Sequence, residues 1–200
     1  MNHLIGATLL ASLVILLLGY FLGCLNGSVM VSHFIIKDDV RQHGSGNAGL
    51  TNFYRTYGAK YALGVILFDM GKTVIACLIG GAAFDYLAGD WMLGVLLGGL
   101  GCELGHMFPV FFGFKGGKGI LSGGTLVWLL TKYVSLGSVC AAASMPVTTF
   151  FFCGRSLLYT ALAVLIAALV IWCHRENITR LLHHQERKFQ WHTGTPKEKE

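Results

Sequence analysis

The chain has 200 residues, of which 54% are hydrophobic and only 12% charged. A soluble domain typically carries about 25% charged residues, and here the apolar residues fall in long blocks. This composition excludes an ordinary soluble domain. The formal net charge of +5 is no sign of nucleic-acid binding, because the loops of membrane proteins also collect Lys and Arg.

Apolar blocks define the predicted fold. Five of them are long enough to cross a bilayer, whose core takes about 20 apolar residues per helix. They run over Leu4–Met30, Tyr61–Phe84, Trp91–Phe112, Val134–Phe152 and Leu157–Cys173. We therefore predict an all-α, polytopic membrane bundle of about five spanning helices. It forms one domain over residues 1–192, followed by a disordered polar tail over 193–200.

The basic residues set the orientation. With five spans, thirteen of the fifteen Lys and Arg residues fall on one side, which the positive-inside rule makes the cytoplasm. The N-terminus is then outside and the tail inside. The apolar stretch Ile120–Leu130 has eleven residues, too few to cross at about 1.5 Å per residue. A crossing there would also move the basic tail to the outer face, so we reject it.

Two features inside the blocks concern packing. Gly19, Gly23 and Gly27 recur every four residues, a spacing that predicts close contact between helix backbones. Asp69 and Lys72 lie one turn apart in the second block, where charges are normally paired. A structural ion pair, a contact near a site and a catalytic role all remain open for this pair.

Three polar clusters lie on the predicted cytoplasmic side. The first runs from Gly44 to Asn52 and is followed by Arg55, the second runs from Gly105 to Gly119, and the third joins Tyr133–Leu136 to His174–Asn177. Their residue types predict an anionic ligand. Glycines permit a positive φ, so that backbone N–H groups can converge on an anion, and Arg offers a planar fork for phosphate oxygens.

The competing interpretation of these clusters is that their cations only mark the cytoplasmic side. It does not explain the glycines, hydroxyls and amides around them. The pattern Gly44-x-Gly46-x-x-Gly49 also matches a dinucleotide fingerprint. That motif needs a preceding strand within a βαβ unit, and here the pattern lies between two membrane helices, so we reject a nucleotide site.

The segments GSGNAGLTNFYR, GHMFPVFFGFKGGKG and YVSL…HRENITRL together resemble, in the same order, the three motif regions of the bacterial acyl-phosphate:glycerol-3-phosphate acyltransferases. The resemblance implies transfer of an acyl group from acyl phosphate to the 1-hydroxyl of glycerol 3-phosphate, giving lysophosphatidic acid and phosphate. It implies an inner-membrane enzyme of phospholipid synthesis whose site faces the cytoplasm. It implies no metal, nucleotide or other cofactor, and it implies as a partner the soluble enzyme that makes acyl phosphate.

The matching positions provide the candidate residues. We expect catalytic roles for Ser45, Arg55, Lys115, His174 and Asn177. We expect substrate binding by Gly44, Gly46, Asn47, Thr51, Asn52, His106, Gly116, Gly117, Lys118, Gly119 and Ser135. The general base stays open between His174, His106 and the phosphate of the substrate, whose second pKa is about 6.

One stretch departs from the family. Family members carry two more spanning helices between the second and third motif regions, for seven in all, whereas only the residues from Gly119 to Tyr133 connect them here. Loss of one hairpin leaves the orientation of the downstream helices unchanged. Two alternatives to an active enzyme follow, namely an inactive relative and a membrane carrier or binding protein for small phosphorylated anions.

Overall fold

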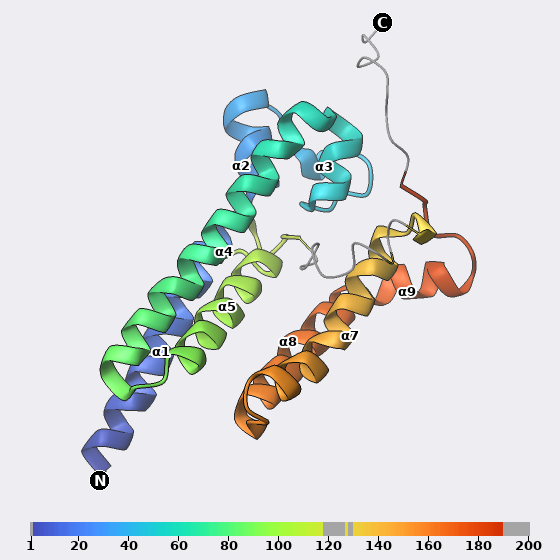
Figure 1. Ribbon diagram of the computed structural model, residues 1–200. Helices are drawn as coiled ribbons and strands as arrows, with labels where there is room; N and C mark the ends of the chain where they lie inside the picture. Colours follow the sequence, from blue (N-terminus) through green and yellow to red (C-terminus); the bar gives the residue numbers. More distant parts are fainter. Residues whose placement is uncertain (1, 118–126, 128–129, 190–200) are drawn as a thin grey trace, which may run out of the picture.

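The computed structural model describes residues 2–117, 127 and 130–189. All the regular secondary structure within these ranges is helical (Figure 1). In chain order the elements are α1 (Asn2–Cys24), α2 (Gly27–Met30), the π-helix η1 (Val31–Ile36), the 3₁₀ helix η2 (Val40–Gln42), α3 (Leu50–Tyr57), α4 (Ala59–Ala88), α5 (Trp91–Met107), the 3₁₀ helix η3 (Val110–Phe112), α7 (Val134–Phe152), α8 (Leu157–Cys173) and α9 (Arg175–Leu182). Lys118, Gly119, most of the stretch Ile120–Leu130 and the tail over 193–200 lie outside the described residues.

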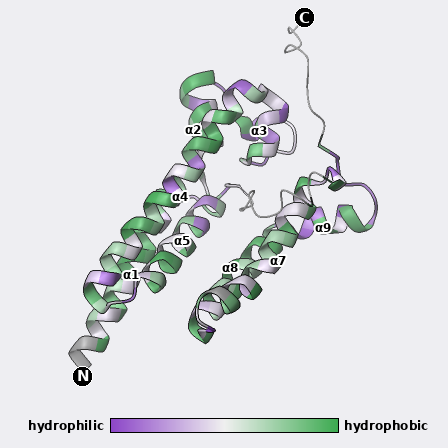
Figure 2. Ribbon diagram, in the orientation of Figure 1, coloured by the Kyte–Doolittle hydropathy of each residue, from purple (hydrophilic) through white to green (hydrophobic). Residues whose placement is uncertain are grey.

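Long apolar helices dominate the described part of the chain. Four of its helical segments are long and apolar enough to cross a membrane, or five if α8 and α9, which meet at a bend of 60°, form one span. The prediction of an all-α membrane bundle with about five spanning helices is thus confirmed. Figure 2 shows mainly apolar helices, with hydrophilic residues gathered around α3 and α9.

Two helical hairpins, α4–α5 and α7–α8, turn at the end of the bundle away from α3 (Figure 1). Gly89 ends α4 with φ 67°, and the carboxylate of Asp90 caps α5 by accepting from Leu93 N at 3.0 Å. Ser156 caps α8 in the other hairpin. The Tyr159 hydroxyl of α8 donates to Asp90 Oδ1 at 2.6 Å, so one hydrogen bond ties the two hairpins together.

Helix α5 packs against α1 through glycines on both helices. A Cβ atom at Gly19 would lie 2.5 Å from a backbone oxygen of α5, and one at Gly23 would collide with Cys102 O. On α5, Gly101 and Gly105 lie just as close to the backbone of α1. The predicted close contact of helix backbones is therefore confirmed at Gly19 and Gly23.

The other side of α5 packs against α4 in the same manner. A Cβ atom at Gly94 would collide with Gly80 O, and one at Gly98 would collide with Ala76 O. Small residues on both helices let their backbones meet without intervening side chains. Helix α5 is thus the centre of a three-helix unit with α1 and α4, and its end carries the second polar cluster.

The first span differs from the prediction. The block Leu4–Met30 was expected to form one helix, but α1 ends at Cys24, and α2 and η1 continue the apolar chain to Ile36. The break occurs at Asn26, whose side chain accepts a hydrogen bond from Val29 N at 3.1 Å and so starts a new helix. Asn favours this cap over a place inside a helix, which explains the position of the break.

Glycine packing can be tested on α5. We expect Gly101→Ala to destabilise the protein by about 1–3 kcal/mol, because the added methyl group overlaps Leu16 O of α1. The midpoint of thermal unfolding in detergent measures the change. The control is Gly64→Ala in α4, where a Cβ atom meets nothing within 4 Å. Equal midpoints for the two variants would contradict backbone contact as the basis of this packing.

Candidate active site

The three polar clusters lie at the same end of the bundle, around α3, the end of α5 and the junction of α8 with α9 (Figures 1 and 2). Contacts between elements join them. Arg41 Nη1 donates to Phe112 O at 3.0 Å. This bond connects η2, just before the loop of the first cluster, to η3 within the loop of the second cluster. Cys173 Sγ lies 3.2 Å from Met107 Sδ and connects the end of α8 to the end of α5. The clusters therefore form one candidate site.

Asn52 of α3 holds the first glycine loop in shape. Its buried side-chain nitrogen donates to Val40 O, His43 O and Asn47 O at distances of 3.0 to 3.1 Å. Its Oδ1 accepts from Ser45 N at 3.0 Å. Both ends of the amide are thus engaged with the loop backbone. The structure gives Asn52 an anchoring task, and its direct contact with a substrate stays a prediction.

The turn at the tip of this loop needs glycine. Gly44 and Gly46 have φ values of 60° and 70°, and a Cβ atom at Gly44 would also collide with Asn52 Oδ1. The N–H groups of Ser45 and Gly46 both point inward, to Asn52 Oδ1 and His43 O. The predicted convergence of backbone N–H groups on an anion is therefore not seen at these two positions. The exposed Ser45 side chain remains as the polar group of the tip.

Helix α3 adds Arg55 to the first cluster. Asn47 and Thr51 are half-buried before and at the start of the helix, and Arg55 follows one turn after Thr51 on the same face. Arg55 is exposed, and its Nη2 donates to Arg187 O over 3.5 Å. A bond at the limit of hydrogen-bond length is readily replaced by an anionic ligand. Arg55 can thus exchange this contact for an anion, and its contact with a phosphate stays a prediction.

The second loop lies against the end of α5. Gly117 N donates to His106 O at 3.0 Å. A Cβ atom at Gly116 would collide with His106 O and approach Pro109, and one at Gly117 would collide with the His106 ring. The two glycines therefore let this loop pass directly over His106. The Lys115 side chain, immediately before them, is exposed.

An ion pair between buried Lys72 and half-buried Asp69 closes the break in the first span. Lys72 Nζ lies 2.7 Å from Asp69 Oδ1 and also donates to Gly23 O and Leu25 O at 3.1 and 2.9 Å. Asp69 Oδ1 accepts from Gly27 N at 3.0 Å. Backbone groups freed by a helix break need partners at membrane depth, and this pair provides them. Gly27 contacts the Asp69 carboxylate instead of a helix backbone, so its predicted packing role is wrong.

The ion pair extends to His106 and so to the second loop. Lys72 Nζ lies 3.1 Å from His106 Nδ1. An ammonium has three protons and only donates, so it shares one of them between Nδ1 and another acceptor, and the neutral ring carries its own proton on Nε2. Protonating Nδ1 as well would place a second positive charge beside Lys72. His106 is consequently better suited to supporting the loop than to accepting a proton from a substrate.

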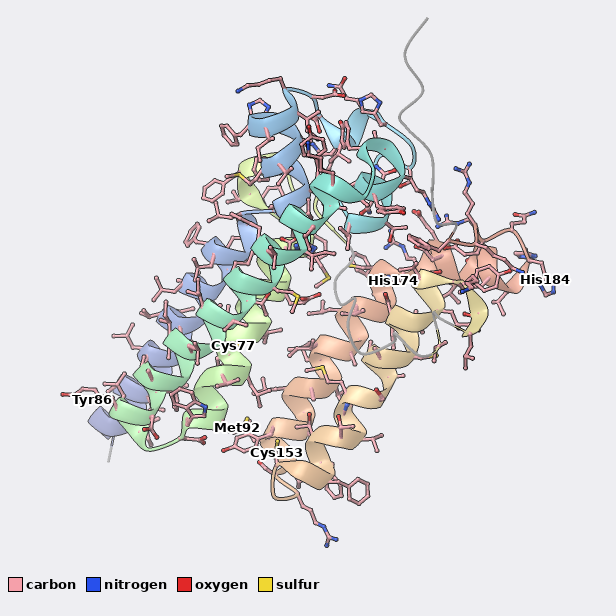
Figure 3. All side chains as sticks on the ribbon, turned by 45° about the horizontal axis from the view of Figure 1, so that its top comes forward. Cys77, Tyr86, Met92, Cys153, His174 and His184 are labelled. Carbon is pink, nitrogen blue, oxygen red and sulfur yellow. The ribbon has the colours of Figure 1, made fainter. Side chains whose placement is uncertain are left out.

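His174 has the opposite tautomer. It is buried at the junction of α8 and α9 (Figure 3), and its Nδ1 lies 2.8 Å from Val170 O. A carbonyl oxygen can only accept, so Nδ1 carries the proton, and Nε2 of the neutral ring is unprotonated. An imidazole nitrogen of this kind can take a proton. Of the two candidate histidines, His174 has the chemistry of a general base.

The third cluster includes a carboxylate that the sequence analysis did not single out. Ser135 Oγ and Asn177 Nδ2 both donate to Glu186 Oε1 at 2.8 Å. Arg180 Nε donates to Glu186 Oε2 at 2.7 Å. Ser135 and Asn177, which are 42 positions apart in the sequence, are thereby brought to one point. Glu186 lies in a polar stretch rich in charges, where no pattern marks it.

Comparisons with known proteins show the family to which the chain belongs. The sequence profile of the family described as Glycerol-3-phosphate acyltransferase matches residues 13–127 and 121–184. A glycerol-3-phosphate acyltransferase of Finegoldia magna is 35% identical over 187 positions, which cover 84% of this chain and 91% of that protein. One of Shouchella clausii is 39% identical over 193 positions, covering 86% of this chain and 93% of that protein.

Solved structures of the family resemble this chain in fold and sequence. Crystal structures of PlsY, an integral membrane glycerol 3-phosphate acyltransferase, in its glycerol 3-phosphate and lysophosphatidic acid forms have TM-scores of 0.75 and 0.73 with this chain. Each is 35% identical and covers 90% of this chain, which in turn covers 96% and 95% of the two PlsY chains. The two profile segments overlap at residues 121–127, within the short stretch from Gly119 to Tyr133.

The ion pair of Lys72 and Asp69 is open to a direct test. We expect Lys72→Met to lower the stability by about 3 kcal/mol or more, because it leaves Asp69 unpaired and the carbonyls of Gly23 and Leu25 without a donor. The measurement is thermal unfolding in detergent. Lys60→Met, which changes an exposed lysine at the start of the same helix, is the control. Unfolding of both variants at the same temperature would show that the break does not depend on Lys72.

Proposed function

The chain belongs to the glycerol-3-phosphate acyltransferase family, and on this basis we propose that it uses acyl phosphate to acylate the 1-hydroxyl of glycerol 3-phosphate. The products are lysophosphatidic acid and inorganic phosphate. The protein is a membrane acyltransferase. What we propose beyond this activity is that the donor is acyl phosphate and that the acylated group is the 1-hydroxyl of glycerol 3-phosphate.

The observation that carries this proposal is the meeting of three polar clusters at one end of an apolar bundle. Both substrates carry a phosphate, and the donor also carries a fatty chain. A site with exposed Arg55 and Lys115 suits the phosphates, and the apolar helices beneath it suit the chain. Charge-assisted hydrogen bonds to phosphate are the strongest polar contacts that such a site can offer.

The reaction assigns a task to each group. The hydroxyl oxygen of glycerol 3-phosphate forms a bond to the acyl carbon, and the bond from that carbon to the phosphate oxygen breaks. Negative charge develops on the acyl oxygen and on the leaving phosphate. Arg55 and Lys115, with Ser45 nearby on the first loop, supply the positive charge and donors that stabilise it. The hydroxyl proton goes to a base.

We assign the base to His174 because its Nδ1 donates to Val170 O, which leaves Nε2 of the neutral ring unprotonated. His106, which accepts from Lys72 at Nδ1, serves the loop at Gly116 and Gly117 instead. The phosphate of the substrate is the other group able to take the proton. Only the first possibility requires a histidine at position 174, so a variant of His174 separates the two.

We place the site on the cytoplasmic face of a bacterial inner membrane, with the N-terminus outside and the C-terminal tail inside. Support comes from the thirteen of fifteen basic residues that fall on the side of the three clusters. This placement also gives access to acyl phosphate made by a soluble enzyme of the cytoplasm.

The assay for the proposal uses the purified protein with acyl phosphate and glycerol 3-phosphate. We expect lysophosphatidic acid from the wild type and a loss of about 10²- to 10³-fold in kcat/KM for Arg55→Ala and for Lys115→Ala. Lys60→Ala, another exposed lysine, is the matched control. Equal product from acyl-CoA would overturn the donor. Folded protein that binds glycerol 3-phosphate without product would favour the carrier or the inactive relative.

The assignment of the base has its own test. His174→Asn keeps an N–H donor for Val170 O and removes the accepting Nε2. We expect kcat to fall by about 10²- to 10⁴-fold with a smaller change in KM. Full kcat in this variant would transfer the role of base to the substrate phosphate. His184→Asn, at an exposed position after α9, is the control.

A further inference from the structure

The segment that follows α9 contacts residues of the first and third clusters of the site. We name residues Glu186–Phe189 the C-terminal strap. Glu186 contacts the start of α7 and α9, and Arg187 and Phe189 contact α3. It leaves the end of α9 and passes the start of α7 (Figure 1). Such consecutive engagement is unlike a loose tail on a protein surface.

The later residues of the strap fix its path. Phe189 N donates to Lys132 O at 2.7 Å, and the Phe189 ring lies 5.1 Å from the ring of Tyr54 on α3. The ammonium of Lys188 lies 5.6 Å from the ring centre of Tyr133, a cation–π distance. Helix α3 and the α7–α8 hairpin belong to different parts of the bundle, so the strap is a bridge between them.

Glu186 provides the polar centre of the strap. Its side chain is only 11% exposed, and it accepts from Ser135, Asn177 and Arg180. Burial alone raises the pKa of this carboxyl group. The hydrogen bonds from Asn177, Arg180 and Ser135 outweigh burial and hold the pKa below its usual value. Glu186 is therefore an ionised acceptor at neutral pH.

This contact decides what Ser135 can do. A serine hydroxyl has one proton and two acceptor lone pairs, and the Ser135 proton is given to Glu186 Oε1 at 2.8 Å. The remaining capacity of the Ser135 oxygen is to accept. A substrate hydroxyl can donate to it, whereas an ionised phosphate oxygen cannot. The Ser135 oxygen is thus suited to accept a hydrogen bond from a hydroxyl group of glycerol 3-phosphate.

We infer that Glu186 is a positioning residue of the acyltransferase site, which fixes Ser135 and Asn177 for the acceptor while the C-terminal strap holds them against α3. The expected effect of Glu186 on kinetics rests on the proposed function. The expected role of Glu186 in holding the strap rests on the contacts alone. The opposite possibility is that Glu186 occupies the place of a substrate phosphate and blocks the site. The two predict opposite effects on removal of the carboxylate.

The kinetic test compares Glu186→Ala with Glu186→Gln. We expect Glu186→Ala to raise KM for glycerol 3-phosphate and to lower kcat/KM by about ten- to hundredfold, because misplaced groups lose orientation. KM for acyl phosphate should change less. Glu186→Gln keeps an acceptor oxygen for Ser135 and Asn177, and loses mainly the pair with Arg180, so it should recover most of the activity.

The control and the contrary outcomes follow from the same contacts. Asp85→Ala, which changes an exposed acidic residue of α4 at the opposite end of the bundle, should behave as the wild type. Higher activity or a lower KM in Glu186→Ala would show a blocking carboxylate and overturn the inference. Equal losses in the Ala and Gln variants would also overturn it, since a positioning acceptor is retained in Gln.

A second readout needs no turnover. Trypsin cuts after Arg187 and Lys188, two residues of the strap that contact Arg55 and Tyr133, respectively. We expect these two bonds in detergent-purified Glu186→Ala to be cut several-fold faster than in the wild type or in Glu186→Gln, as measured by mass spectrometry. Unchanged cleavage would show that Glu186 does not hold the strap. This result stands whether or not the wild-type protein makes lysophosphatidic acid, so the two proposals fail separately.

Discussion

The ion pair of Asp69 and Lys72 is the contact on which the site depends most. It supplies partners to three backbone groups where the first span breaks, at Gly23, Leu25 and Gly27. Beyond the break the chain continues through α2 and η1 toward the region that ends in α3. The same ammonium reaches His106, over which the second loop passes. One pair of charges on α4 therefore sets the geometry of two of the three clusters.

The third cluster is assembled differently. Its groups come from the start of α7 and from α9, and a single carboxylate, Glu186, collects them. The α7–α8 hairpin meets the three-helix unit at the Tyr159–Asp90 bond on the far end and at Cys173–Met107 on the near end. Contacts at both ends of the hairpin keep His174 at a fixed place relative to α5. Rigid placement of this kind is what catalytic geometry requires.

Hydropathy and spacing in the sequence predicted the spans, a close approach of helix backbones at Gly19 and Gly23, and the clusters themselves. These features are local, since they depend on residues near one another in the chain. The roles of Lys72 and Glu186 could not be predicted, because each depends on groups 49 and 51 positions away, Gly23 and Ser135. The first span was predicted too short, because nothing in its composition marks a π-helix.

The order of the elements along the chain has a consequence for biosynthesis. Helices α1, α4 and α5 pack on one another through their own glycines, so this unit has all its partners before the α7–α8 hairpin leaves the ribosome. The C-terminal strap follows α9, the last described helix. A nascent chain therefore packs the unit of α1, α4 and α5 first and assembles the third cluster only after α9 has been made. The scaffold of the site is thus in place before Glu186 collects Ser135 and Asn177.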